Sequence, residues 1–224
     1  TRYSCARKNV MSELATFFVL AFSTLFTLVN PIGLTPVYLS LVEQFEMEER
    51  KKIALKGTIT ATFILIIFFL MGDIIFSFYG ITVAAFKIAG GILFFRTGIQ
   101  MIESRISRSR STPKEEEEAE TREDIAYTPI GMPLIAGPGA ITSVLILSSE
   151  SPKWELRLVL FGIIAIVLLL TYVIFLGADY LNQRFGTTGL RIVQRIMGLI
   201  LMVIAVQFVI DGVEEVVREW GWMN

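Results

Sequence analysis

The sequence predicts an all-α integral membrane protein of six transmembrane helices, arranged as a 3+3 inverted repeat with helices 1 and 4 broken at the midplane. Three observations lead to this prediction. Of the 224 residues, 54% are hydrophobic and only 18% are charged, a composition too apolar for a soluble domain of this size. Six apolar segments reach the roughly 20 residues that a spanning helix needs. The two halves of the chain also match each other at a nearly constant offset.

The six predicted spans leave little chain for any domain outside the membrane. They cover approximately residues 14–42, 54–78, 84–103, 125–149, 158–181 and 189–212. The only long polar stretch, 104–124, begins with arginines and continues into a run of glutamates. We interpret it as a solvated linker, with a docking or regulatory segment as the alternative. The predicted organisation is an N-terminal tail or added remnant (1–10), a first repeat (11–103), the linker (104–124) and a second repeat (125–224).

The internal repeat emerges when the second half is laid over the first so that Pro138 falls on Pro31, a spacing called here the repeat offset. At the repeat offset Thr142 falls on Thr35. Three spans in each half force the two copies into opposite orientations across the bilayer, which is the plan common among secondary transporters. Further pairs at the repeat offset, or displaced from it by one or two positions, are Val37/Val144, Gly91/Gly198, Gln100/Gln207, Gly57/Gly162, Asp73/Asp179 and Gly80/Gly186.

The distribution of basic residues predicts the orientation in the membrane. The connections after helices 1, 3 and 5 hold more Lys and Arg than the connections on the other side, with Arg50, Lys51 and Lys52 as one cluster. Because cytoplasmic loops are enriched in these residues, we expect both termini outside and linker 104–124 in the cytoplasm.

Composition also excludes several classes of function. A net charge of −1 gives no footprint for nucleic-acid binding. The chain has no His and a single cysteine, Cys5, which excludes histidine-based zinc sites and Ser-His-Asp catalytic triads. No Gly-rich nucleotide loop is present. We expect no catalytic residue, metal or cofactor. An intramembrane carboxylate enzyme is the competing class, but the predicted topology separates Asp73 from Asp179 across the bilayer.

The two helix breaks are the strongest candidates for a functional site. Asn30-Pro31-Ile32-Gly33 lies mid-way along the first apolar segment, and Gly137-Pro138-Gly139 lies mid-way along the fourth. Proline removes a helical hydrogen bond, and unwound backbone in hydrocarbon survives only where protein covers it or it lines a cavity. The half-helices beyond the breaks should present their N-terminal N–H groups to one anion site. The predicted substrate-binding residues are Asn30, Pro31, Gly33, Thr35, Gly137, Pro138, Gly139 and Thr142.

Other readings of these residues stay open. The breaks could be ordinary proline kinks, with the threonines bonded to carbonyls of their own helices. Candidates for gating or coupling are Asp73, Asp179, Gln100 and Gln207, although aspartates at helix ends are often hydrated and intramembrane glutamines often bridge helices. Arg96 lies within the third apolar segment, where we expect its side chain to snorkel toward the interface.

The two break segments, with Phe86-Lys87-Ile88-Ala89-Gly90-Gly91 opening the third span, resemble the signature segments of the MarC family. The likeness covers essentially the whole chain after Met11. It implies a multi-pass protein of the bacterial or archaeal inner membrane that transports small neutral amino acids such as glycine and alanine. A proton or sodium gradient, or the substrate's own gradient, would drive transport. Direction and oligomeric state stay open. The alternative is a regulatory or assembly membrane protein that transports nothing.

Overall fold

The computed structural model describes residues 2–103 and 125–220; side chains are described from Glu13 onward, except at positions 73, 129, 133 and 187. The predicted linker 104–124 therefore lies outside the described residues. The described chain is helical, with no strand in either range. Its elements are α1 (Arg2–Val29), α2 (Pro31–Val42), α3 (Met47–Tyr79), α4 (Val83–Ile102), η1 (Ala126–Ile135), α8 (Pro138–Ser149), α9 (Trp154–Leu176) and α10 (Ala178–Glu219). Because α1 begins at Arg2, the expected N-terminal tail continues the first helix.

Within the described ranges, five helical stretches are long and apolar enough to cross a membrane, and they begin at Glu13, Met47, Val83, Trp154 and Thr188. They account for the first, second, third, fifth and sixth predicted spans. The fourth predicted span, 125–149, is divided between η1 and α8, and α8 has only 12 residues. Neither part reaches the roughly 20 residues that spanning requires, so this segment could cross a bilayer only as two pieces in series.

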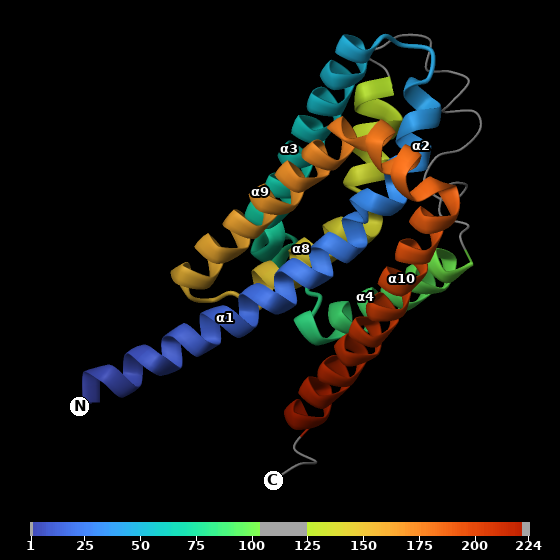
Figure 1. The fold of residues 1–224 in the computed structure, drawn as a ribbon. Coiled ribbons are helices and arrows are strands. Elements are labelled where there is room, and N and C mark those ends of the chain that lie inside the picture. The colour runs from blue at the N-terminus through green and yellow to red at the C-terminus, as the bar shows by residue number, and fades with distance from the viewer. Residues whose placement is uncertain (1, 104–124, 221–224) are drawn as a thin grey trace.

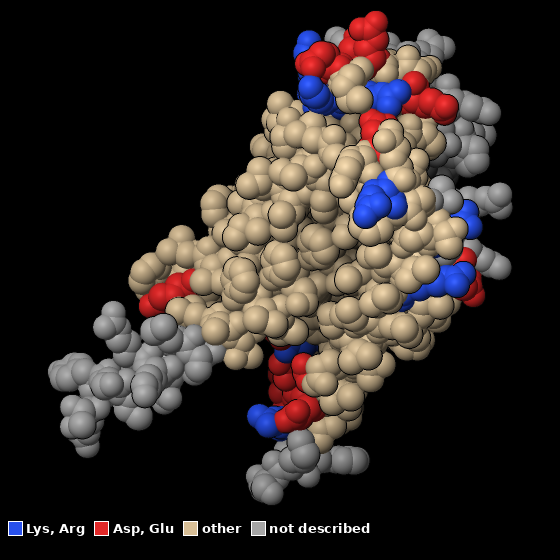
Figure 2. All heavy atoms as spheres, in the orientation of Figure 1, with Lys and Arg blue, Asp and Glu red and all other residues tan. Residues whose placement is uncertain are grey.

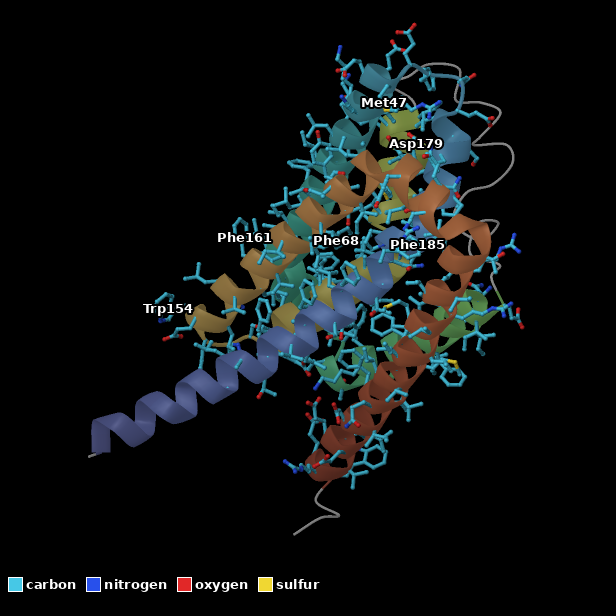
Figure 3. All side chains as sticks on the ribbon, viewed as in Figure 1. Met47, Phe68, Trp154, Phe161, Asp179 and Phe185 are labelled. Atoms are coloured by element: carbon cyan, nitrogen blue, oxygen red, sulfur yellow. The ribbon has the colours of Figure 1, made fainter. Side chains whose placement is uncertain are left out.

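The helices pack as a bundle around α1 and α8 (Figure 1). Helix α1 contacts α8, α9 and α10, while α3 contacts η1, α8 and α9. Charged side chains gather toward the two ends of the bundle and along its right flank in Figure 2, whereas the broad surface over α3, α9 and α1 is uncharged on the face shown. Met47 and Asp179 lie toward one end and Trp154 toward the other (Figure 3). This banded surface is that of a protein embedded in lipid.

Helices α4 and α10 form the most extensive contact between two helices of the described chain, and they pack through glycines. A Cβ added at Gly91 would lie 2.7 Å from the carbonyl oxygen of Ala205, and one at Gly198 would lie 2.8 Å from that of Gly98. Both distances are too short for a side chain, so only glycine permits this packing. The two contacts are reciprocal, because the repeat offset places position 198 on position 91 and position 205 on position 98.

The helix boundaries follow the same spacing. Helices α2 and α8 both have 12 residues and begin at Pro31 and Pro138. Helices α3 and α9 begin at Met47 and Trp154, which are also separated by the repeat offset. Gly80 ends α3 with φ 62°, and Gly186, also at φ 62°, bends α10. Glycine tolerates this left-handed conformation, which would strain other residues.

Candidate functional site

The first break is a single residue, Asn30, between α1 and α2. It adopts the left-handed conformation (φ 51°, ψ 54°), the only non-glycine residue with positive φ in the described ranges. Its side-chain Oδ1 accepts a hydrogen bond from the N–H of Gly33 at 3.3 Å, and its carbonyl accepts one from Leu34 at 3.0 Å. Asparagine is a preferred N-cap that tolerates this conformation. The N-terminus of α2 is thus largely closed by the residue that breaks the helix.

The residues around Asn30 are enclosed by protein. Asn30 is 2% exposed and Thr35 is fully buried. The Thr35 hydroxyl donates to the carbonyl of Pro31 at 3.2 Å, so it is used within its own helix. The side-chain Nδ2 of Asn30 is buried with no hydrogen-bond partner, which leaves one donor unsatisfied at the first break.

The second break lies at Ala136 and Gly137, between η1 and α8. Gly137 is extended (φ −74°, ψ 168°) and occupies the N-cap position of α8 with Pro138 following it. Having no side chain, Gly137 cannot cap the N–H groups of the first turn. Its carbonyl accepts a hydrogen bond from Ile141 at 3.1 Å, which starts the helix. The N-terminus of α8 is therefore open where that of α2 is closed.

The segment before the second break is a widened, π-type helix for a local reason. Thr128 and Met132 have extended backbone angles (φ −137° and −141°), and each directly precedes a proline. The ring of a proline disfavours helical geometry in the residue before it. The prolines at 129 and 133 thus prevent η1 from forming a regular α-helix.

The two breaks lie against each other in the core. A Cβ added at Gly139 would come within 2.9 Å of Leu28 Cδ2, so a residue at the end of α1 covers the start of α8. Leu28 and Val29 are buried, as are Ile135 and Ala136 at the second break. Irregular backbone at both positions is shielded by protein, as the membrane interior requires.

A cavity of about 190 Å³ opens beside the second break. Residues 137–139 form one wall, and Leu93, Arg96, Thr97 and Gln100 of α4 form the other. The Thr97 hydroxyl donates to the carbonyl of Leu93 at 2.9 Å, so it can still accept a hydrogen bond from a ligand. Arg96 makes no ion pair with any described residue.

The electrostatics of this cavity favour an anionic group. Arg96, an exposed residue that lines the cavity, carries a full positive charge, and the uncapped N-terminus of α8 supplies a partial one. None of the described residues that line the cavity carries a carboxylate. A carboxylate entering the cavity could accept hydrogen bonds from the guanidinium, from the Gln100 amide and from backbone N–H groups.

The structure brings only some of the predicted residues together. Gly137, Pro138, Gly139 and Gln100 line the cavity. The predicted residues of the first break, Asn30, Pro31, Gly33 and Thr35, are buried and do not line the cavity. The Thr142 methyl group packs on α4, since a Cβ at Gly90 would lie 2.9 Å from it. We expected the Arg96 side chain to snorkel; the residue is exposed and lines the cavity. The sequence signal that Arg96 could face a site is its charge within a membrane span.

Two of the other predicted gating residues, Gln207 and Asp179, lie elsewhere. Gln207 borders a different cavity and donates to Asp211 at 2.7 Å. Asp179 forms an ion pair with Arg50 at 3.5 Å, and Arg50 also donates to the carbonyl of Phe45 at 2.8 Å. This pair joins the start of α3 to the start of α10. The side chain of Asp73 lies outside the described residues.

A helical bundle with five described stretches of membrane-spanning length, built around two buried helix breaks, defines a multi-pass integral membrane protein. The family model described as MarC family integral membrane protein matches residues 15–217. The chain therefore belongs to the MarC family.

Relatives of similar length support this assignment. The chain is 37% identical to a UPF0056 membrane protein of Aquifex aeolicus over 93% of this chain and 97% of the relative. It is 39% identical to one of Methanocaldococcus jannaschii, over 88% and 96%. It is 33% identical to the UPF0056 membrane protein YhcE of Escherichia coli, over 86% and 90%. No solved structure matches the chain.

Proposed function

We propose that this protein is a secondary transporter that carries small neutral amino acids, of the glycine and alanine type, across the inner membrane by alternating access. The observation that carries the proposal is the cavity at the open N-terminus of α8, facing Arg96 on α4. A site between a broken helix and a neighbouring helix is the arrangement by which many secondary transporters hold a substrate carboxylate.

The cavity suits a small solute. Drug-sized ligands occupy pockets of about 300–1,000 Å³, and this cavity of about 190 Å³ lies below that range. The carboxylate would lie against residues 137–139 and Arg96. The ammonium group would be held by acceptors, namely the Gln100 amide oxygen, the Thr97 hydroxyl and backbone carbonyls freed at the break.

Alternating access requires two halves that move against each other, and we propose that the halves are 3+3 inverted repeats. Two features support this division. Equivalent helices begin at the repeat offset, at Pro31 and Pro138 and at Met47 and Trp154. The reciprocal glycine contacts between α4 and α10 are those of a two-fold relation, in which a residue and its equivalent exchange partners. In this scheme η1 and α8 together form the fourth, interrupted span.

Orientation and energy source complete the proposal. Both termini would face outside and linker 104–124 the cytoplasm, according to the distribution of Lys and Arg. Without a nucleotide loop in the sequence, a proton gradient, a sodium gradient or the substrate's own gradient would drive transport.

The experiment is uptake of labelled alanine and glycine into proteoliposomes that contain the purified protein. We expect saturable uptake above that of protein-free liposomes, and imposing a proton or a sodium gradient in turn identifies the coupling ion. Absence of saturable flux under every gradient, with protein shown to be folded and inserted, would reject the transporter and favour a regulatory or assembly role.

A further inference from the structure

A buried lysine holds together three helices at the end of α8 opposite the proposed substrate cavity. Lys87 of α4 has a side chain only 5% exposed. Its ammonium group pairs with Glu150, the residue that ends α8, at 2.7 Å and with Glu215 of α10 at 2.5 Å. The molecule therefore already binds a primary ammonium group at this point, between two carboxylates from different helices.

A cavity of about 250 Å³ adjoins this cluster through Glu150. Leu20 of α1 and Val203 and Phe208 of α10 form its apolar wall. Gln207 and Asp211 supply its other polar groups, and the Gln207 amide donates to Asp211 at 2.7 Å. The cavity thus combines an apolar surface with two carboxylates, one of them shared with Lys87.

Carboxylates outnumber cations around this cavity. Glu150 and Glu215 share a single ammonium group, that of Lys87. Glu214 pairs with Arg218, and this pair borders the same neighbouring pocket as Lys87, Asp211 and Glu215. Asp211 accepts a hydrogen bond from the Gln207 amide, which is neutral and does not balance its charge. Among the described residues, the four carboxylates of Glu150, Asp211, Glu214 and Glu215 against the two cations of Lys87 and Arg218 leave two negative charges to attract a further cation.

We propose that this cavity binds the primary ammonium group of a small solute, and that Lys87 competes with that solute for Glu150. If the protein transports amino acids as proposed, this cavity is a second binding site, or station, for the substrate, near the end of the bundle that holds the termini. The identification of the solute as an amino acid rests on that proposed function. The substrate's ammonium would lie between Asp211 and Glu150, with its alkyl group on the wall formed by Leu20, Val203 and Phe208.

Helix α8 connects this station to the first one. Its N-terminus lines the cavity that suits a carboxylate, and Glu150 follows its last residue. Twelve helical residues span about 18 Å, too far for one small amino acid to reach both cavities at once. The two cavities would therefore be occupied in succession, and displacement of Lys87 from Glu150 would release α8 from α4.

Ethylammonium is the probe that separates this proposal from transport itself. Binding is measured by calorimetry on the purified full-length protein in detergent, with propionate as the matched anion. We expect saturable ethylammonium binding that E150Q and D211N each weaken by about tenfold, the effect of losing one charge-assisted hydrogen bond. E214Q is the matched control, because Glu214 pairs with Arg218 and does not line the cavity.

The possible results distinguish failure of the second station from failure of the proposed transport function. Absence of ethylammonium binding to the wild-type protein, or equal binding by wild type, D211N and E214Q, overturns the second station whatever the result for alanine transport. Conversely, ethylammonium binding with the expected variant pattern upholds the station even if alanine is not transported, in which case the proposed substrate is wrong.

Lys87→Gln tests the competition. Replacing the ammonium by an amide leaves Glu150 and Glu215 without their resident cation, so ethylammonium should bind about tenfold more tightly. Weaker binding by a K87Q protein that elutes as a single folded species would show that Lys87 builds the site instead of competing for it, and would overturn that part of the proposal. Lys153→Gln is the control, since Lys153 forms an exposed pair with Glu13.

Discussion

Both helix breaks have a proline at the first position of the half-helix that follows, but the N-terminus of one half-helix is capped by a side chain and that of the other is not. At the first break Asn30 turns its own side chain onto the N–H of Gly33 and closes the N-terminus of α2. At the second break Gly137 has no side chain to offer, and the N-terminus of α8 opens onto a cavity. The residue before the proline therefore decides which break is structural and which can bind a ligand.

The neighbouring helix reinforces this difference. Arg96 and Gln100 of α4 face the open break. The positions on α10 that match them at the repeat offset are Val203 and Gln207, and they border the second cavity instead. In the proposed repeat, an arginine at only one of the two matching positions would give the two cavities opposite charge preferences, which suits a solute that carries both charges.

The largest expected effect comes from filling the open break. Gly139→Leu would place a branched side chain where a Cβ already meets Leu28 at 2.9 Å and where the cavity begins. We expect alanine uptake into proteoliposomes to fall to background. Gly162→Leu is the control, because a Cβ at Gly162 meets nothing within 4 Å. Normal uptake by folded G139L protein would place the substrate away from α8.

The next effect tests the charge of the open break. Arg96→Gln removes the cation of the cavity while keeping a hydrogen-bonding side chain. Loss of a charge-assisted hydrogen bond costs about 1.5–3 kcal/mol, so the KM for alanine should rise about tenfold to hundredfold. Arg195→Gln, at an exposed position of α10, controls for loss of surface charge. If the two variants transport alike, Arg96 contributes nothing to substrate binding.

The closed break should respond in stability. Asn30→Ala removes the cap of α2 and leaves alanine, which has no capping side chain, at φ 51°. A lost cap costs about 1 kcal/mol and the left-handed conformation a further 1–2 kcal/mol. A thermal melt in detergent should show the midpoint lowered by several degrees. Asn30→Gly, which keeps the backbone freedom, should lose less.

An equal melting temperature for N30A and wild type would mean that the Asn30 cap does not stabilise the break. A large loss of alanine affinity in N30A protein that melts normally would instead return Asn30 to the binding site. In that case the unpartnered Nδ2 of Asn30 would be the group that reaches the substrate.

How much of this could be predicted from the sequence differs between backbone and side chains. Proline and glycine fix local geometry, so the interruptions were predicted correctly, and α2 and α8 begin at Pro31 and Pro138. Apolar length likewise located the five spanning stretches of the described chain. The fourth span was expected as one broken helix, but the distortions before Pro129 and Pro133 divide it further.

Which residues line the cavity depends on contacts between helices, and local sequence does not encode these contacts. That Asn30 folds back on Gly33 depends on a left-handed residue enclosed by the core. That Arg96 faces α8 depends on the rotation of α4, which the close contact of Gly90 with Thr142 helps to set. The sequence predicted two equivalent breaks converging on one anion site, whereas only the second break lines the cavity.

The smallest effect is also the most direct test of the comparison, because it converts the open break into a closed one. Gly137→Ser adds a hydroxyl at an N-cap position whose extended backbone (φ −74°, ψ 168°) already suits a capping residue. The new cap should stabilise the protein by about 1 kcal/mol and raise the melting temperature by about 2–4 °C. The hydroxyl would occupy N–H groups that the substrate carboxylate would use in the proposed site, so alanine should bind about fivefold more weakly.

Gly137→Ala separates the cap from the added carbon, since alanine brings a Cβ without a hydroxyl. A rise in melting temperature for G137S alone, together with weaker alanine binding, would show that an uncapped helix start is kept for the ligand at the expense of stability. If G137S gains stability while alanine affinity stays the same, the N–H groups of α8 do not contact the substrate. The two breaks would then differ in structure without differing in function.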